Sequence, residues 1–99
     1  MLGGLCMKEI YYIHPIVNNH IWITVKRHYK GRDKMFPVFQ IDLPGRWHED
    51  EYNVHVDGCD YQCATLEEAL RRGAYYYHGD RQEEYEFANS EELYDIFQG

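Results

Sequence analysis

The sequence predicts a small α+β domain with an antiparallel sheet of four to five strands. One main helix is expected on one face of that sheet, together with a short C-terminal helix. The fold class follows from apolar and polar residues that alternate over residues 20–29, a turn-forming Asp57-Gly58 pair, and a helix-start pattern at Thr65. At 99 residues the chain suits one domain. We expect residues 1–7 to be disordered and residues 8–99 to form that domain.

The first half of the chain predicts three strands. Residues 8–13 form a short apolar run, and residues 20–29 place Ile and Val on alternate positions. Residues 30–34 predict a basic turn, after which residues 35–43 run back as a partner strand. Pro37 indicates an edge or a bulge in that strand, because proline cannot donate a hydrogen bond to a neighbouring strand.

A hairpin over residues 52–63 is the clearest local element. Asp57-Gly58 is a dipeptide that two-residue type I′ turns prefer. The resulting register pairs three apolar positions with three others, namely Tyr52 with Cys63, Val54 with Tyr61, and Val56 with Cys59. On the other face His55 lies opposite Asp60. The separation of apolar from polar residues favours this register.

A helix is expected to follow the hairpin directly. Thr65 and Glu68 form a capping box, which predicts a helix from residue 66 to about residue 78. Gly73 falls on its apolar stripe and permits a close approach to the sheet, whereas Tyr75 falls on the opposite, exposed side. Residues 85–87 predict a short strand, and a second capping pattern at residues 89–92 predicts the last helix.

Charge is divided unevenly along the chain. Residues 1–47 hold seven Lys or Arg and three Asp or Glu, whereas residues 48–99 hold three and fourteen, for net charges of +4 and −11. A difference of this size between halves suggests a charged partner. A solvated acidic surface that aids solubility is the alternative.

Several classes of protein are disfavoured by the sequence. No apolar stretch is long enough for a membrane span, and the three cysteines are expected to be reduced thiols of a cytoplasmic protein. Cys59 and Cys63 would lie roughly 13 Å apart on one strand, too far apart to share a metal ion. Ser90, Thr24 and Thr65 have structural explanations. We therefore expect no metal, no cofactor and no catalytic activity.

Two surfaces are candidates for partner binding. Ten tyrosines suggest a binding surface, because tyrosine is enriched where proteins contact each other. The expected contact combines tyrosine and acidic side chains: Tyr75, Tyr76, Glu83, Glu84, Glu86, Glu91 and Glu92. A secondary surface lies in the basic half: Trp22, Lys26, His28 and Arg32. Direct nucleic-acid binding through residues 26–34 is an alternative that the acidic half disfavours, because it would repel phosphates.

Two short fragments resemble parts of the HicB antitoxin pattern. They are Asp42-Leu43-Pro44-Gly45 and Thr65-Leu66-Glu67-Glu68-Ala69-Leu70, although about 19 residues separate them where the family has almost none. The resemblance implies a module that neutralises a small RNA-cleaving toxin. In size, acidity and tyrosine content, the chain also resembles small phage inhibitors of host defence, including anti-CRISPR proteins.

The leading hypothesis is a non-enzymatic inhibitor from a phage or mobile element. Its acidic, tyrosine-rich surface would occupy the basic, nucleic-acid-binding surface of a host protein. The antitoxin-like module and the direct nucleic-acid binder stay as alternatives. Exposed sheet edges also permit a homodimer.

Overall fold

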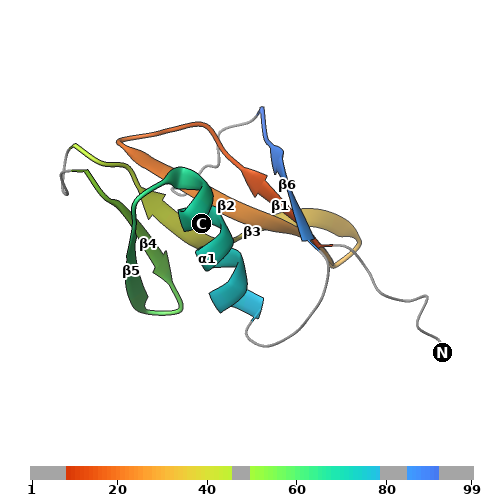
Figure 1. Cartoon of the computed structure of the whole chain (residues 1–99). Coiled ribbons are helices and arrows are strands. Elements are labelled where there is room, and N and C mark those ends of the chain that lie inside the picture. The colour runs from red at the N-terminus through yellow and green to blue at the C-terminus, as the bar shows by residue number, and fades with distance from the viewer. Residues whose placement is uncertain (1–8, 46–49, 79–84, 92–99) are drawn as a thin grey trace.

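The protein is built around one curled, six-stranded sheet with a helix on one face (Figure 1). The computed structural model describes residues 9–45, 50–78 and 85–91. The strands are β1 (Glu9–Ile13), β2 (His20–Tyr29), β3 (Arg32–Asp42), β4 (Tyr52–Val56), β5 (Cys59–Cys63) and β6 (Tyr85–Asn89), and the helix is α1 (Leu66–His78). Their order across the sheet is β5-β4-β3-β2-β1-β6, which gives it the form of a half-barrel.

The prediction of an antiparallel sheet of four to five strands with two helices is wrong. Neighbouring strands from β1 to β5 are antiparallel, but β6 joins the edge beside β1 and runs parallel to it. The chain passes through α1 before it reaches that edge, so β6 can enter in the same direction as β1. The predicted C-terminal helix falls mostly on residues 92–99, which lie outside the described residues. Its expected start at Asn89 belongs to β6.

Three two-residue turns with positive φ connect neighbouring parts of the sheet. Asp57-Gly58 joins β4 to β5 in the predicted register, with φ of 50° and 77°. Lys30-Gly31 joins β2 to β3 with φ of 51° and 82°, and Asn18-Asn19 precedes β2 with φ of 51° and 65°. Positive φ at both positions is the type I′ geometry, which matches the twist of the flanking strands. The predicted basic turn over residues 30–34 is therefore shorter, because Arg32–Asp42 is already strand.

A bulge interrupts the pairing of β2 with β3, as Pro37 predicts. Ile23 lies opposite Phe39, but Thr24 lies opposite Pro37, so Val38 is the extra residue. Proline removes one ladder donor, and a bulge is a place where that loss is tolerated.

The core lies between α1 and the face of β3, β4 and β5 that the helix covers. The helix begins as predicted, with the backbone N–H of Glu68 donating to Thr65 Oγ1 at 3.1 Å. Gly73 allows the close approach expected of it, because a Cβ at this position would overlap the Phe39 ring. Phe39 and Val54 are buried in the contact.

Aromatic rings fill the other end of this core, beneath β1 and β6. Tyr11 is fully buried. Its ring centroid lies 5.5 Å from that of Phe87, 5.7 Å from Tyr85, 6.0 Å from Phe39 and 6.2 Å from Tyr77. Through this cluster, β1 contacts the end of the helix and β6 at the same time.

Candidate functional site: two surfaces and a histidine–aspartate cluster

The predicted partner-binding residues are divided between two elements. Tyr75 and Tyr76 lie on α1, while Glu86 lies in β6 and Glu91 follows that strand. Glu83, Glu84 and Glu92 lie outside the described residues. Glu86 alternates with Tyr85 and Phe87, which contact Tyr11 on the helix side. Glu86 therefore faces the opposite side of the sheet from Tyr75.

Tyrosine and arginine side chains gather around one hollow on the outer side of α1. Tyr75 is 56% exposed, and its ring centroid lies 5.3 Å from that of Tyr76. Tyr76 in turn stacks on Tyr61 of β5 at 4.0 Å. The hollow measures about 420 Å³ and is lined by Glu68, Arg71, Arg72, Tyr75, Tyr76 and Tyr85. We call this group of residues the tyrosine surface.

The charges of the tyrosine surface are mixed rather than purely acidic. Glu67 pairs with Arg71 at 2.5 Å, and Glu68 pairs with Arg72 at 3.8 Å. These pairs join side chains one helical turn apart, where opposite charges offset each other. The excess acidic charge of the second half must therefore come from residues outside α1.

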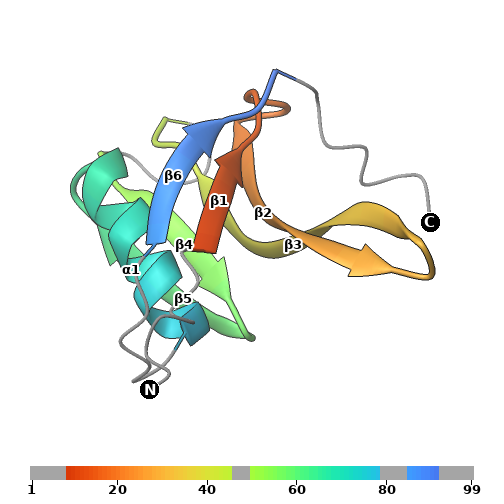
Figure 2. The ribbon, with the colours of Figure 1, turned by 90° about the vertical axis from the view of Figure 1, so that its right-hand side faces the viewer.

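The secondary surface is divided by the sheet as well. Trp22, Lys26 and His28 alternate along one face of β2, whereas Arg32 lies opposite Tyr29 and faces the other way. The part of the hairpin that carries Lys26, His28 and Arg32, residues 26–35, reaches beyond the helix and the other four strands (Figure 2). We call residues 26–35 the basic arm, since they hold five Lys or Arg and one Asp.

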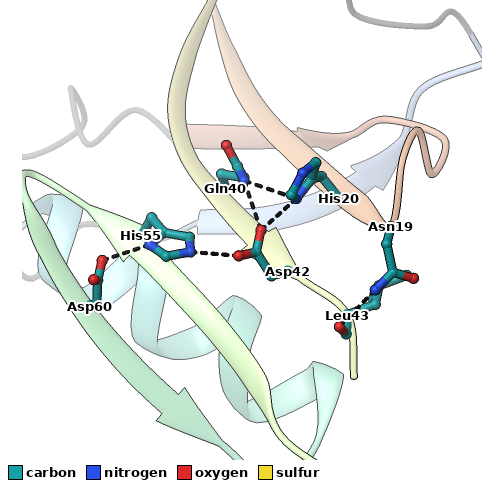
Figure 3. Close-up of polar contacts among 7 residues, drawn as sticks. All are labelled: Asn19, His20, Gln40, Asp42, Leu43, His55 and Asp60. Atoms are coloured by element: carbon teal, nitrogen blue, oxygen red, sulfur yellow. Dashed lines mark hydrogen bonds and ion pairs between the residues drawn. The ribbon is translucent and has the colours of Figure 1, made fainter. Parts of the chain in front are cut away.

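A cluster of histidine and aspartate side chains was missed by the sequence analysis. It lies on the face of the sheet away from α1 and joins β2, β3, β4 and β5 (Figure 3). Asp42 Oδ1 lies 2.5 Å from His20 Nδ1 and 2.7 Å from Gln40 Nε2. Its Oδ2 lies 2.8 Å from His55 Nε2, and the other ring nitrogen of His55 lies 2.6 Å from Asp60.

The cluster favours charged side chains at Asp42 and His55. Burial acts to raise the pKa of Asp42, but hydrogen bonds from His55, Gln40 and His20 outweigh it and hold that pKa below 3.8. Burial acts to lower the pKa of His55, but hydrogen bonds to Asp42 and Asp60 raise it above 6.5. An ionised carboxylate only accepts hydrogen bonds, so the contact with Asp42 favours the protonated form of the His55 ring.

This cluster ties together four strands of the sheet, because its members come from β2, β3, β4 and β5. None of its hydrogen bonds, within the part of the chain that the structure describes, reaches a Ser, Thr or Cys side chain. The predicted hairpin register already places His55 opposite Asp60. Predicting that Asp42 and His20 join this pair requires the register of β3 with β4 and that of β2 with β3. No local sequence pattern contains these registers.

The structure of residues 9–45, 50–78 and 85–91 contains no cluster of side chains that could bind a metal ion. There, no three His, Cys, Asp or Glu side chains are placed to share an ion. Cys59 and Cys63 are free thiols, and burial raises the pKa of Cys63. No helix among the described residues is long and apolar enough to cross a membrane.

Comparison with known proteins adds no relative: no family model, no curated protein and no solved structure matches the chain. A function for this protein therefore has to be argued from its own surfaces. The HicB-like fragments are separated by the complete β4–β5 hairpin.

Proposed function

We propose that the protein acts by binding another protein, without catalysis of its own, and that the tyrosine surface makes the contact. The observation that carries this role is the exposure of Tyr75 beside Tyr76, Arg71 and Arg72 around one hollow. Tyrosine and arginine are, with tryptophan, enriched at the energetic centre of protein interfaces. Tyr75 points away from the core, so the packing of α1 does not require a tyrosine at this position.

The surface is also partly ordered before any partner arrives. Tyr76 is held by its stack on Tyr61, while Arg71 and Arg72 make exposed pairs with Glu67 and Glu68 that order them only weakly. Side chains that are already fixed lose less conformational entropy on binding. This favours a contact made by α1 without rearrangement of the sheet.

The charge of the second half favours a basic partner. Residues 48–99 carry a net charge of −11, and Glu86 and Glu91 are exposed. Such charge attracts a protein whose own surface is built to hold nucleic acid, and occupying that surface would inhibit it. We therefore infer an inhibitor of a nucleic-acid-handling host protein, encoded by a phage or mobile element. Free thiols at Cys59 and Cys63 suit a cytoplasmic location.

A pull-down tests this role directly. The tagged protein is incubated with nuclease-treated bacterial lysate and washed at rising salt, and the retained proteins are identified by mass. We expect a nucleic-acid-handling protein that is retained at low salt and released at high salt, because salt screens exposed charges. Tyr75→Ala should abolish its capture. Tyr29→Ala is the matched control, since Tyr29 is 49% exposed but lies on the basic arm.

Two outcomes would contradict the proposal. Equal capture by Tyr75→Ala and the unaltered protein would remove the tyrosine surface from the contact. A small partner that persists at high salt would instead favour apolar contact, as in the antitoxin-like alternative. Charge reversal at Glu83, Glu84 and Glu86 separately tests the acidic contribution.

A further inference from the structure

We propose that the basic arm is a binding platform for single-stranded nucleic acid. Tyr29 and, at the base of the arm, Phe36 would stack on bases, while Arg32 and Lys34 would hold phosphates. This activity goes beyond protein binding by the tyrosine surface and does not depend on it, because the two surfaces share no residue.

The register of the arm gathers these side chains on one face. Val25 lies opposite Phe36, Arg27 opposite Lys34, and Tyr29 opposite Arg32. Directly opposed side chains of an antiparallel pair project to the same side. That side, continuous with the face under α1, therefore carries two aromatic rings and three cations: Tyr29, Phe36, Arg27, Arg32 and Lys34. The other side carries Lys26, His28, Asp33 and Met35.

The positive charge of this face is not explained by the stability of the hairpin. Like charges placed directly opposite each other destabilise a strand pair, and Arg27 opposes Lys34. Glu9 offsets Arg27 through contacts of 2.6 and 3.1 Å. No ion pair formed within residues 9–45, 50–78 and 85–91 includes Lys30, Arg32 or Lys34. An anion bound on this face would relieve the repulsion.

Exposed aromatic rings and cations lie close together on this face. Tyr29 is 49% and Phe36 is 40% exposed. Lys30 Nζ and Lys34 Nζ lie over the Tyr29 ring, 5.3 and 5.4 Å from its centre, so a stacking base would take the place of one of these ammonium groups. A hollow of about 390 Å³ at the base of the arm is lined by Val25, Arg27, His28, Tyr29, Phe36, Pro37, Val38 and Tyr77.

A single strand fits these features better than a duplex. Stacking on a side chain requires a base whose flat face is free, and bases in a duplex are already stacked on one another. Stacking combined with nearby cations is how proteins hold single strands without reading their sequence. The partner is therefore expected to be bound with little sequence preference.

The acidic remainder of the protein limits the contact to the arm. The arm projects away from α1, β4 and β5 (Figure 2), so a short strand can approach it without crossing the helix. The net charge of −7 for the whole chain disfavours contact with a longer nucleic-acid strand that would continue past the arm. With Lys30, Arg32 and Lys34 each offsetting one phosphate, the logarithm of affinity should fall with the logarithm of salt concentration with a slope of about −2.

Fluorescence anisotropy with the full chain and a labelled oligothymidine tests the platform. We expect binding at low salt with the stated slope, about tenfold weaker binding for Tyr29→Ala, and little change for Tyr29→Phe, which keeps the ring. Lys34→Gln and Arg32→Gln should each weaken binding. Lys26→Gln is the matched control, because it removes the same charge from the opposite side of the arm, where Lys26 lies over the Tyr12 ring.

Three results would overturn the proposal. One is that the unaltered protein does not bind the oligonucleotide at low salt. Thermal melting must show that this protein, Tyr29→Ala and Lys34→Gln are all equally folded. Another is a loss for Lys26→Gln as large as that for Lys34→Gln, which would indicate attraction by charge alone. The third is a duplex of the same sequence bound as tightly as the single strand.

Discussion

At the scale of a single residue, Gly73 sets the distance between the helix and the sheet. Gly73→Ala should destabilise the protein by about 1–3 kcal/mol, because the added methyl group overlaps the Phe39 ring. Alanine's better helix propensity, about 1 kcal/mol, offsets only part of this. Urea denaturation measures the change. In a Phe39→Leu background the cost of Gly73→Ala should shrink, and an unchanged cost would show that the ring is not the cause.

The His55 side chain makes stability depend on pH. Its folded-state pKa is raised above 6.5, so its contribution is complete below about pH 6.5 and is lost as the pH rises through the raised value. The pKa of Asp42 is lowered from 3.8, so its contribution is present above pH 3.8 and is lost as the pH falls through the lowered value. The cluster should therefore stabilise the fold most between about pH 3.8 and 6.5.

Thermal melting across this range checks that window. His55→Gln should lower the melting temperature most near pH 5 to 6, with the difference from the unaltered protein narrowing above it. His28→Gln is the control, because His28 meets Asp33 at 3.2 Å in an exposed pair that contributes little. A difference that stays constant with pH would mean that His55 acts by packing rather than by charge.

At the scale of elements, two hairpins share one turn type but differ in what they support. Gly31 and Gly58 have φ of 82° and 77°, and a Cβ at either position would touch nothing. Alanine there costs about 1–3 kcal/mol through backbone strain alone. We expect Gly58→Ala to lower global stability, because β4 and β5 carry Val54 and Val56 of the core.

The same substitution in the arm should have a local effect only. Gly31→Ala should leave the melting temperature nearly unchanged and speed amide exchange within residues 26–35, because the arm meets other elements through surface contacts such as Arg27 with Glu9 and Lys26 with Tyr12. Hydrogen exchange measured by NMR distinguishes local opening of the arm from a loss of global stability. Equal loss of melting temperature in both variants would show that the arm is part of the core.

These elements also show what the sequence could predict. Asp57-Gly58, Thr65 and Pro37 each act on their immediate neighbours, so the β4–β5 register, the helix start and the bulge could be read from local patterns. The parallel pairing of β6 with β1 joins Tyr85 to Glu9, and no local pattern specifies such a partner. The same holds for the Asp42 cluster, which forms only after four strands are placed side by side.

At the scale of the whole molecule, two surfaces of different chemistry lie on separate elements. The tyrosine surface lies on α1 with Tyr85, and the basic arm belongs to β2 and β3. Arg32→Gln combined with Lys34→Gln should therefore abolish oligonucleotide binding and retain the protein partner. Tyr75→Ala should abolish binding of the protein partner and retain oligonucleotide binding. Parallel anisotropy and pull-down measurements on both variants check this, and a shared loss would indicate one continuous binding surface.

The pairing of β6 with β1 has a consequence for how the protein is made. Tyr11 is among the first described residues, yet its ring is covered by Tyr77, Tyr85 and Phe87. Until residues 85–89 leave the ribosome, the nascent chain holds β1 with an unpaired edge and an exposed aromatic side chain, the features that lead chains to associate with one another. Chains interrupted before residue 85 should aggregate or be degraded, so the cell would accumulate this protein almost entirely in its completed form.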